Sequence, residues 1–212
     1  MAKQKKMERN KTFGTIMKWI VSGILNFVFR VKVHGKENVP VEGPFLLIAN
    51  HGSVFDPLVI QQHVKPWVYW VAKRELFDLP VVGFVLRKIG VISFQREGLD
   101  VTALKNIITL VKSGDVIGIF PQGKRLDHED RDIVLPKSAT AHLARRFKLP
   151  VVPVSIENGY HFFGKKRPHL YFGTPVDMAS LPDDDDQATI DLMRLIFATL
   201  GDDYDPLTRA GS

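Results

Sequence analysis

The sequence predicts a single α/β domain with a largely parallel mixed sheet flanked by helices, preceded by an N-terminal amphipathic helix. After residue 30, short β-branched runs alternate with helical stretches along the chain. Such alternation implies crossover connections and a parallel sheet that is covered on both faces. The 212 residues, 45% of them hydrophobic, suffice for one sizeable core but not for two comfortable domains.

Local patterns predict the individual elements in chain order. Candidate strands are short apolar, β-branched runs at residues 31–34, 45–49, 67–71, 91–94, 116–120, 151–156 and 170–172. Candidate helices begin near Pro57, Val81, Val101, Ser138 and Gln187. In the helix from Val101, apolar residues recur on one side, and Ser113-Gly114 ends it.

The first segment of the chain is apolar and admits several interpretations. Residues 13–29 lie between Lys11 and Arg30 and are interrupted by Lys18 and Asn26. A signal peptide would need a small-residue cleavage site, which the following residues do not offer. A transmembrane helix usually needs about 20 apolar residues, more than this segment has. A helix docked on the protein's own core is a third possibility.

We favour a fourth interpretation, a helix lying in a membrane interface. Apolar residues recur at three- and four-residue steps, so they share one helix face: Phe13, Ile16, Met17, Ile20, Ile24, Phe27 and Val28. Trp19 suits the headgroup boundary, and the lysines and arginine of residues 3–11 would be attracted to an anionic membrane surface. We therefore expect residues 1–30 to be a membrane-binding segment and residues 31–212 the globular domain.

Composition narrows the chemistry. The chain has no cysteine, which excludes a thiol nucleophile, disulfides and thiolate metal sites. Its net charge of +6 fits partners such as anionic lipid, phosphorylated substrates or nucleic acid. No recognised nucleic-acid motif accompanies the basic clusters, so we expect no nucleic-acid partner.

A histidine and an aspartate follow the buried run at residues 45–49. His51 falls just past this strand, where parallel α/β sheets carry their sites, and Pro57 makes Asp56 a candidate helix N-cap. The spacing lets the Asp56 carboxylate reach one imidazole nitrogen, leaving the other to take a proton from an alcohol. The pattern alone is weak, because Asp56 can merely cap a helix while His51 fills a loop.

Three further blocks supply context. The turn at residues 120–125 follows another buried strand, and its Lys124 and Arg125 suit a phosphate, although solvated cations on a surface turn would look the same. A strand at residues 90–96 ends in Arg96, and residues 149–156 form an apolar strand rich in proline.

In this order and spacing, the four blocks resemble the lysophosphatidate (1-acylglycerol-3-phosphate) acyltransferase family of glycerolipid acyltransferases. The resemblance covers roughly residues 31–175. It rests on these matching positions: Asn50, His51, Asp56 and Pro57; Gly90, Phe94 and Arg96; Phe120, Pro121, Gly123 and Arg125; Val152, Pro153 and Val154; and Lys73. Two residues depart from the family pattern: Gln122 replaces a glutamate and Lys124 a threonine. Both changes raise the local charge, so an acceptor other than the usual one is an alternative.

The resemblance implies a reaction and a set of roles. His51 would be the general base and Asp56 its orienting partner, while Lys73, Arg96, Gln122, Gly123, Lys124 and Arg125 would bind the acceptor. The donor would be acyl-CoA or acyl carrier protein, the acceptor a lysophospholipid, and no cofactor or metal would be needed. The enzyme would work as a peripheral or monotopic protein on the cytoplasmic face of the cell membrane. Alternatives are acylation of glycerol-3-phosphate, another lysophospholipid or a glycolipid, and a non-catalytic phospholipid-binding relative.

Overall fold

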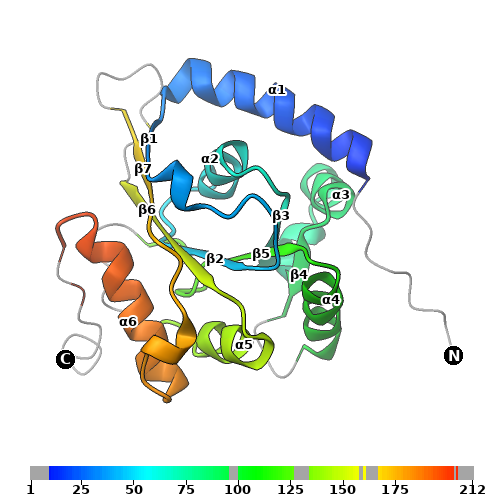
Figure 1. Ribbon diagram of the computed structural model, residues 1–212. Helices are drawn as coiled ribbons and strands as arrows, with labels where there is room; N and C mark the ends of the chain where they lie inside the picture. Colours follow the sequence, from blue (N-terminus) through cyan, green and yellow to red (C-terminus); the bar gives the residue numbers. More distant parts are fainter. Residues whose placement is uncertain are drawn as a thin grey trace, which may run out of the picture.

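The protein folds around one mixed sheet with helices on both faces (Figure 1). The computed structural model describes residues 10–95, 100–126, 134–157, 160, 167–202 and 204. The strands are β1 (Lys32–His34), β2 (Leu46–Ala49), β3 (Val68–Lys73), β4 (Ile92–Phe94), β5 (Val116–Ile119), β6 (Val151–Glu157) and β7 (His169–Phe172). The α-helices are α1 (Lys11–Phe29), α2 (Asp56–His63), α3 (Pro80–Ile89), α4 (Val101–Lys112), α5 (Ala139–Phe147) and α6 (Asp185–Ala198). Short 3₁₀ helices are η1 (Lys36–Asn38), η2 (Arg74–Phe77) and η4 (Met178–Ser180).

The strands lie in the order β1-β7-β6-β2-β5-β3-β4. Every neighbouring pair is parallel except β6 and β7, which are antiparallel. The predicted fold class, a largely parallel mixed sheet flanked by helices, is therefore confirmed. Each predicted strand forms within two residues of its expected bounds, and each predicted helix starts within two residues of its expected start.

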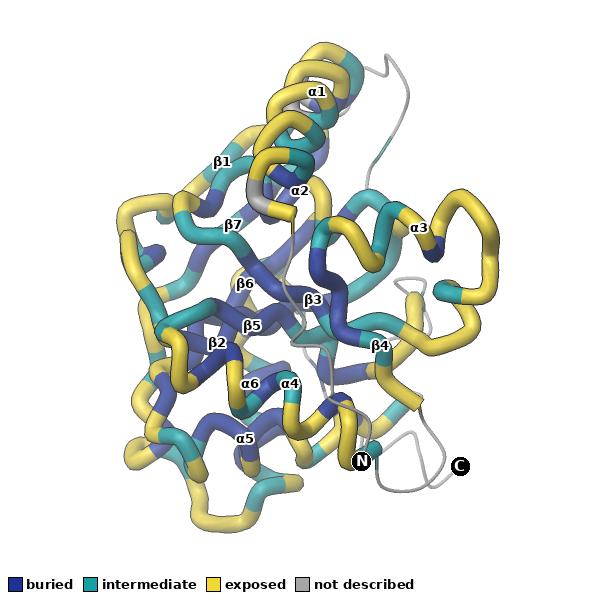
Figure 2. Tube along the Cα trace, turned by 90° about the vertical axis from the view of Figure 1, so that its right-hand side faces the viewer, coloured by how far each residue is buried: buried dark blue, intermediate teal, exposed yellow. Residues whose placement is uncertain are grey.

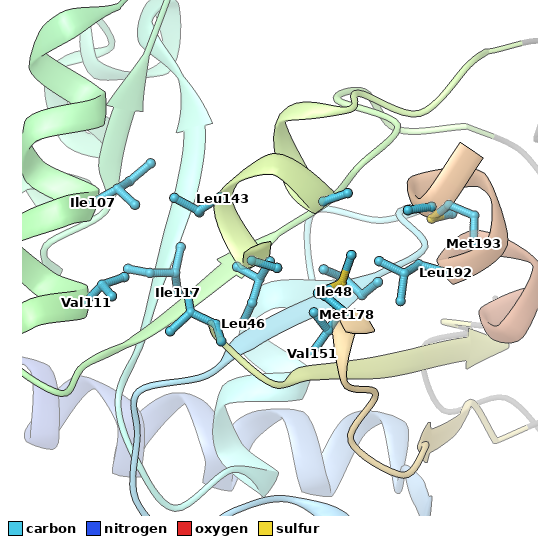
Figure 3. Packing of buried hydrophobic residues seen from close by; sticks show 14 of the residues in the cluster. Leu46, Ile48, Ile107, Val111, Ile117, Leu143, Val151, Met178, Leu192 and Met193 are labelled. Carbon is cyan, nitrogen blue, oxygen red and sulfur yellow. The ribbon is translucent and has the colours of Figure 1, made fainter. Parts of the chain in front are cut away.

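Strand side chains alternate between two hydrophobic cores, one on each face of the sheet. Leu46 and Ile48 of β2 point into the core beneath α4, α5 and α6, part of which Figure 3 shows. Leu47 and Ala49 point into the opposite core, which α1 and α2 cover. Both cores bury strand residues completely, which explains why these runs read as continuously apolar in the sequence.

Helix α1 packs on the protein through one side only. Its Leu25 and Phe29 are buried in the core above α2. Lys18 Nζ donates a hydrogen bond of 2.9 Å to the carbonyl oxygen of Val64, the residue that ends α2. The charge that interrupts the apolar segment thus turns toward the protein. Docking on the core, one of the alternatives for this segment, is therefore true of this side of the helix.

Candidate active site

The carboxyl ends of three neighbouring parallel strands assemble the candidate site. β2 leads into His51, β5 leads into the turn at residues 121–125, and β3 ends in Lys73. Because β2 pairs with β5 and β5 pairs with β3, all parallel, these ends lie at one edge of the sheet. This is the edge at which open α/β sheets hold their ligands.

Asn50 fixes the point where the chain leaves β2. Its side-chain amide donates to the carbonyl oxygen of Ile156 at 2.8 Å, and its Oδ1 accepts from the Ile156 amide at 2.8 Å. The buried side chain therefore continues the pairing of β2 with β6 after the β2 backbone has turned away. Sequence reasoning placed Asn50 in the motif but assigned it no role.

The Asp56 carboxylate is the organising group of the loop that follows. Its Oδ2 accepts hydrogen bonds from the backbone amides of Gly52 at 2.9 Å and Ser53 at 2.8 Å, and it lies 2.8 Å from Nδ1 of His51. The residue is completely buried. Two backbone donors on the oxygen that contacts the imidazole favour an ionised carboxylate, which can only accept.

Asp56 is not the helix N-cap that the sequence suggested. Phe55 occupies the cap position, and Asp56 is the first residue of α2. Its side chain turns back to the preceding loop, where the amides of Gly52 and Ser53 point at it. Pro57 marked the start of the helix correctly to within one residue. It could not show whether the Asp56 carboxylate would accept hydrogen bonds from the helix amides or from the preceding loop.

The imidazole of His51 is oriented through one nitrogen. Because the Asp56 carboxylate accepts, the neutral imidazole must carry its hydrogen on Nδ1, which leaves the lone pair on Nε2. In the described part of the chain, Nε2 has no hydrogen-bond partner, and the His51 side chain is 17% exposed. The contact with one nitrogen that the spacing predicted is confirmed, and the arrangement can accept a proton from an alcohol.

An aromatic stack fixes the plane of this ring. The imidazole lies 3.9 Å, centroid to centroid, from the ring of Phe120 at an interplanar angle of 18°. Phe120 stacks in turn on Trp70, at 4.8 Å and 14°. Gly118 makes room for this arrangement, since a Cβ on it would lie 2.6 Å from Cε3 of Trp70. Sequence reasoning missed Trp70 and Gly118, although Phe120 follows Gly118 by two residues at the end of β5.

The turn at residues 121–125 packs against the same loop. The amide of Leu126 donates to the carbonyl oxygen of His51 at 2.9 Å, which ties the end of the turn to the histidine backbone. Gln122 is buried, whereas Gly123, Lys124 and Arg125 are exposed. Gly123 has a φ of +68°, a conformation that favours glycine. Two exposed cations therefore lie on a turn that is hydrogen-bonded to the histidine backbone.

The remaining predicted binding residues differ in position. Lys73 is exposed at the end of β3, where its Nζ lies 3.0 Å from a carboxylate oxygen of Glu75. Arg96 lies outside the described residues, so its role stays a prediction. The structure thus brings His51, Asp56 and the turn at residues 121–125 together, with Lys73 on the neighbouring strand at the same edge.

Comparisons with known proteins all indicate one family. A protein-family model described as Acyltransferase matches residues 30–157, more than half of the chain. A 1-acyl-sn-glycerol-3-phosphate acyltransferase of Bacillus subtilis is 32% identical over 166 residues, which cover 75% of this chain and 81% of that protein. One of Borreliella burgdorferi is 31% identical over 64% of this chain, which spans only 54% of that protein.

A solved structure agrees with these sequences. The crystal structure of the 1-acyl-sn-glycerophosphate (LPA) acyltransferase PlsC from Thermotoga maritima superposes with a TM-score of 0.68 at 25% sequence identity, covering 90% of this chain and 78% of that one. The chain therefore belongs to the acyltransferase family, among the 1-acyl-sn-glycerol-3-phosphate acyltransferases.

Proposed function

We propose that His51 is the general base with which this O-acyltransferase acylates the free hydroxyl of 1-acylglycerol-3-phosphate. The product is phosphatidate, the precursor from which phospholipids are built. The relatives named above support this acceptor. The observation that carries the proposal is the 2.8 Å contact between His51 Nδ1 and the buried Asp56 carboxylate, which leaves Nε2 as the proton acceptor.

The chemistry follows from that tautomer. Nε2 of His51 takes the proton of the acceptor hydroxyl while its oxygen attacks the thioester carbonyl of acyl-CoA or acyl carrier protein. The tetrahedral intermediate collapses, the carbon–sulfur bond breaks, and the imidazolium returns the proton to the leaving sulfur. Asp56 keeps the ring oriented and stabilises the imidazolium that forms between these steps. General-base assistance of this kind is worth about 10²- to 10⁴-fold in rate.

The acceptor phosphate would be held by the cations at the same edge of the sheet. Lys124 and Arg125 are exposed and form no ion pair within the residues that the structure describes. Lys73 can exchange its exposed partner Glu75 for a phosphate, since such surface pairs contribute at most about 1 kcal/mol. We include Arg96, Gln122 and Gly123 in the binding site because of their positions in the family motifs.

Membrane attachment is the second part of the proposal, and α1 and α3 carry it. We define the α1/α3 apolar face as the exposed side chains of Ile16, Trp19, Ile20, Ile24, Phe27, Val81, Val82 and Phe84. The two helices are in contact, and Figure 2 shows exposed stretches along both. Eight exposed apolar side chains on two contacting helices suit burial in a bilayer rather than exposure to water.

The position of α1 favours attachment to one leaflet over a membrane-spanning helix. Among the described residues, α1 is long and apolar enough to cross a bilayer by length and composition, a test that core helices also pass. Its inner side, however, is occupied by Leu25, Phe29 and the inward-turned Lys18. A helix that must keep this side on the protein would lie along the interface, with the cytoplasmic face of the cell membrane as the proposed location.

The test is product analysis with the full chain. Purified protein in detergent-lipid micelles receives acyl-CoA or acyl carrier protein together with 1-acylglycerol-3-phosphate, glycerol-3-phosphate or other lysophospholipids, and products are identified by mass spectrometry. We expect phosphatidate, with a loss of about 10²- to 10⁴-fold in kcat for His51→Ala and unchanged acceptor binding. His142→Ala, a change to an exposed histidine on α5, is the matched control.

Each outcome is decisive. Near-normal turnover by His51→Ala would refute the general-base role, even if phosphatidate is formed. Selective acylation of another acceptor would refute the assigned acceptor and point to Gln122 and Lys124 as its cause. Acceptor binding without any thioester consumption would identify a non-catalytic relative.

A further inference from the structure

The Asp56 carboxylate has one oxygen whose partner the loop does not supply. Oδ2 accepts hydrogen bonds from His51 Nδ1 and from the amides of Gly52 and Ser53. Oδ1 is buried and has no hydrogen-bond partner among the described residues. Burying a carboxylate oxygen without a partner destabilises the folded state, because the oxygen loses its hydrogen bonds to water and forms none in the protein. A donor is therefore needed on this side of the carboxylate.

Tyr160 brings a buried hydroxyl to the same place. Its ring packs edge-on against Phe29, with centroids 5.1 Å apart, and lies 6.0 Å from the ring of Phe55, the residue before Asp56. Its hydroxyl oxygen is buried and likewise has no hydrogen-bond partner in the described ranges of the chain. Burial, the charge of Asp56 and hydrogen-bonding reach to that carboxylate raise the pKa of Tyr160, so the hydroxyl remains protonated and available as a donor.

We propose that Tyr160 donates its hydroxyl hydrogen to Oδ1 of Asp56 and thereby acts as a positioning residue for His51. The inference rests on the proposed role of His51 as general base. Among the described residues, Oδ1 and the tyrosine hydroxyl are both buried and both lack a hydrogen-bond partner, and Tyr160 is close enough to the Asp56 carboxylate to interact with it. The carboxylate is then held at both oxygens, so it cannot rotate away from Nδ1 of His51.

The contacts of Tyr160 also explain how it is kept in place. Phe29 is the last residue of α1, and Phe55 lies 5.3 Å from it, so the three rings form one cluster between α1 and the start of α2. This cluster belongs to the core above α2, on the face of the sheet that also receives Phe120 and Trp70. Tyr160 is therefore held against the end of α1 and the residue that precedes Asp56.

Tyr160→Phe tests the proposal because it keeps the ring and removes only the hydroxyl. We expect kcat to fall about 5- to 30-fold with KM values for both substrates within twofold of wild type, since the substrate is not touched. In an Asp56→Asn background the same change should cost less than a further twofold, because Tyr160 acts through that carboxylate. Tyr204→Phe, a change to a buried tyrosine in the other core, is the matched control and should leave kcat unchanged.

A measurement that needs no turnover separates this inference from the proposed function. Nitrogen-15 NMR of labelled histidine reports which ring nitrogen carries the hydrogen. We expect His51 to hold its hydrogen on Nδ1 in wild type and to become a mixture of tautomers in Tyr160→Phe. If wild type turns over no substrate, the proposed function fails while this spectrum still tests the contact. An unchanged tautomer in Tyr160→Phe, or an equal loss of kcat in the Asp56→Asn background, would overturn the inference.

Discussion

The stacked rings beside His51 depend on the smallest residue of β5. The imidazole has one hydrogen-bonded nitrogen, and a single bond leaves its plane free to swing. Phe120 removes that freedom by covering one face of the ring, and Trp70 supports Phe120 from behind. Trp70 can lie there only because Gly118, on the adjacent strand, has no side chain. The orientation of the His51 ring thus depends on Gly118, three residues before the turn at residues 121–125.

Gly118→Ala should therefore impair catalysis from a distance. The new Cβ would lie 2.6 Å from Cε3 of Trp70 and 2.7 Å from Cγ1 of Val68, so the indole must move. We expect a loss of stability of about 1 to 3 kcal/mol and a lower kcat, because Phe120 loses its support. Thermal unfolding and steady-state kinetics measure the two effects.

Gly23→Ala is the matched control for that substitution. A Cβ on Gly23, within α1, meets nothing within 4 Å, and alanine favours a helix over glycine by about 1 kcal/mol. This variant should keep full activity and be no less stable than wild type. A normal kcat in Gly118→Ala, despite a displaced Trp70 in its structure, would show that the stack does not position His51.

At the residue scale, spacing predicted the pairing of His51 with Asp56 but not the rest of its surroundings. The four intervening residues allow the carboxylate to return to the ring, and the structure confirms that it does. The amides of Gly52 and Ser53 carry no sequence signal, since every residue has an amide. Tyr160 lies more than a hundred residues away, so only the folded chain brings its hydroxyl to Asp56.

Among the elements, local periodicity predicted the strands and helices because each buries a continuous apolar run. The helix from Val101 starts where expected and ends in the predicted Ser113-Gly114 turn. The order of the strands was beyond the sequence, since β2 lies between β6 and β5, which are far from it in the chain. The antiparallel pairing of β6 and β7 was equally hidden, because the direction of a strand leaves no trace in its composition.

Helix α1 shows why its sequence allowed several interpretations. It is apolar on two sides, one of which packs on the core through Leu25 and Phe29. The other side remains exposed, with Trp19 at 77% and Phe27 at 74%. A periodicity argument finds both sides apolar and cannot say which of them meets the protein. The division at residue 30 stays a prediction, although α1 is packed on the domain that follows it.

Ile20→Glu tests whether the α1/α3 apolar face binds a bilayer. The side chain is 53% exposed in the middle of α1, so the substitution should leave the fold intact. Losing the burial of one isoleucine, about 1.5 to 3 kcal/mol, should weaken binding to vesicles of phosphatidylcholine and phosphatidylglycerol by at least about tenfold. Vesicle flotation at several lipid concentrations gives the partition constant.

The control for this experiment lies on the opposite face of the molecule. Leu195 of α6 is 45% exposed, beneath the other side of the sheet, and Leu195→Glu should bind vesicles like wild type. Equal binding by Ile20→Glu and wild type would contradict the proposed membrane face. Equal loss in both variants would mean that added negative charge, rather than the position of the side chain, reduces the affinity.

In the molecule as a whole, some charged side chains stabilise the fold and others lie exposed at the candidate active site. The acidic run that follows η4 is used within the fold: Asp184 caps α6, and Arg145 Nε lies 3.0 Å from a carboxylate oxygen of Asp185. By contrast, Lys124 and Arg125 have no ion pair within the described residues. The excess positive charge of the chain is thus partly concentrated on the turn where we propose that the acceptor phosphate binds, which total charge alone could not predict.

Stability of the whole molecule should fall in mild acid because of His63, where α1, η1 and α2 meet. Burial, followed by the charges of Lys36 and Lys18, lowers the pKa of His63 from 6.5 to about 4. Between pH 6.5 and pH 4, His63 is protonated in the unfolded chain but mostly neutral in the folded chain, so acid favours unfolding. The loss begins as the pH falls below about 6.5 and is complete near 4. Partial solvent screening limits it to about 1 to 2 kcal/mol.

His63→Gln should remove this part of the pH dependence. Urea unfolding at pH 7 and at pH 4.5 gives the loss of unfolding free energy for each protein, and the loss should be about 1 to 2 kcal/mol smaller in the variant than in wild type. The substitution leaves Lys18 on the Val64 carbonyl, so α1 stays docked at both pH values. His142→Gln, on the exposed side of α5, should retain the full loss. Equal losses in wild type and His63→Gln would mean that the acid sensitivity of the fold originates elsewhere than at the junction of α1 and α2.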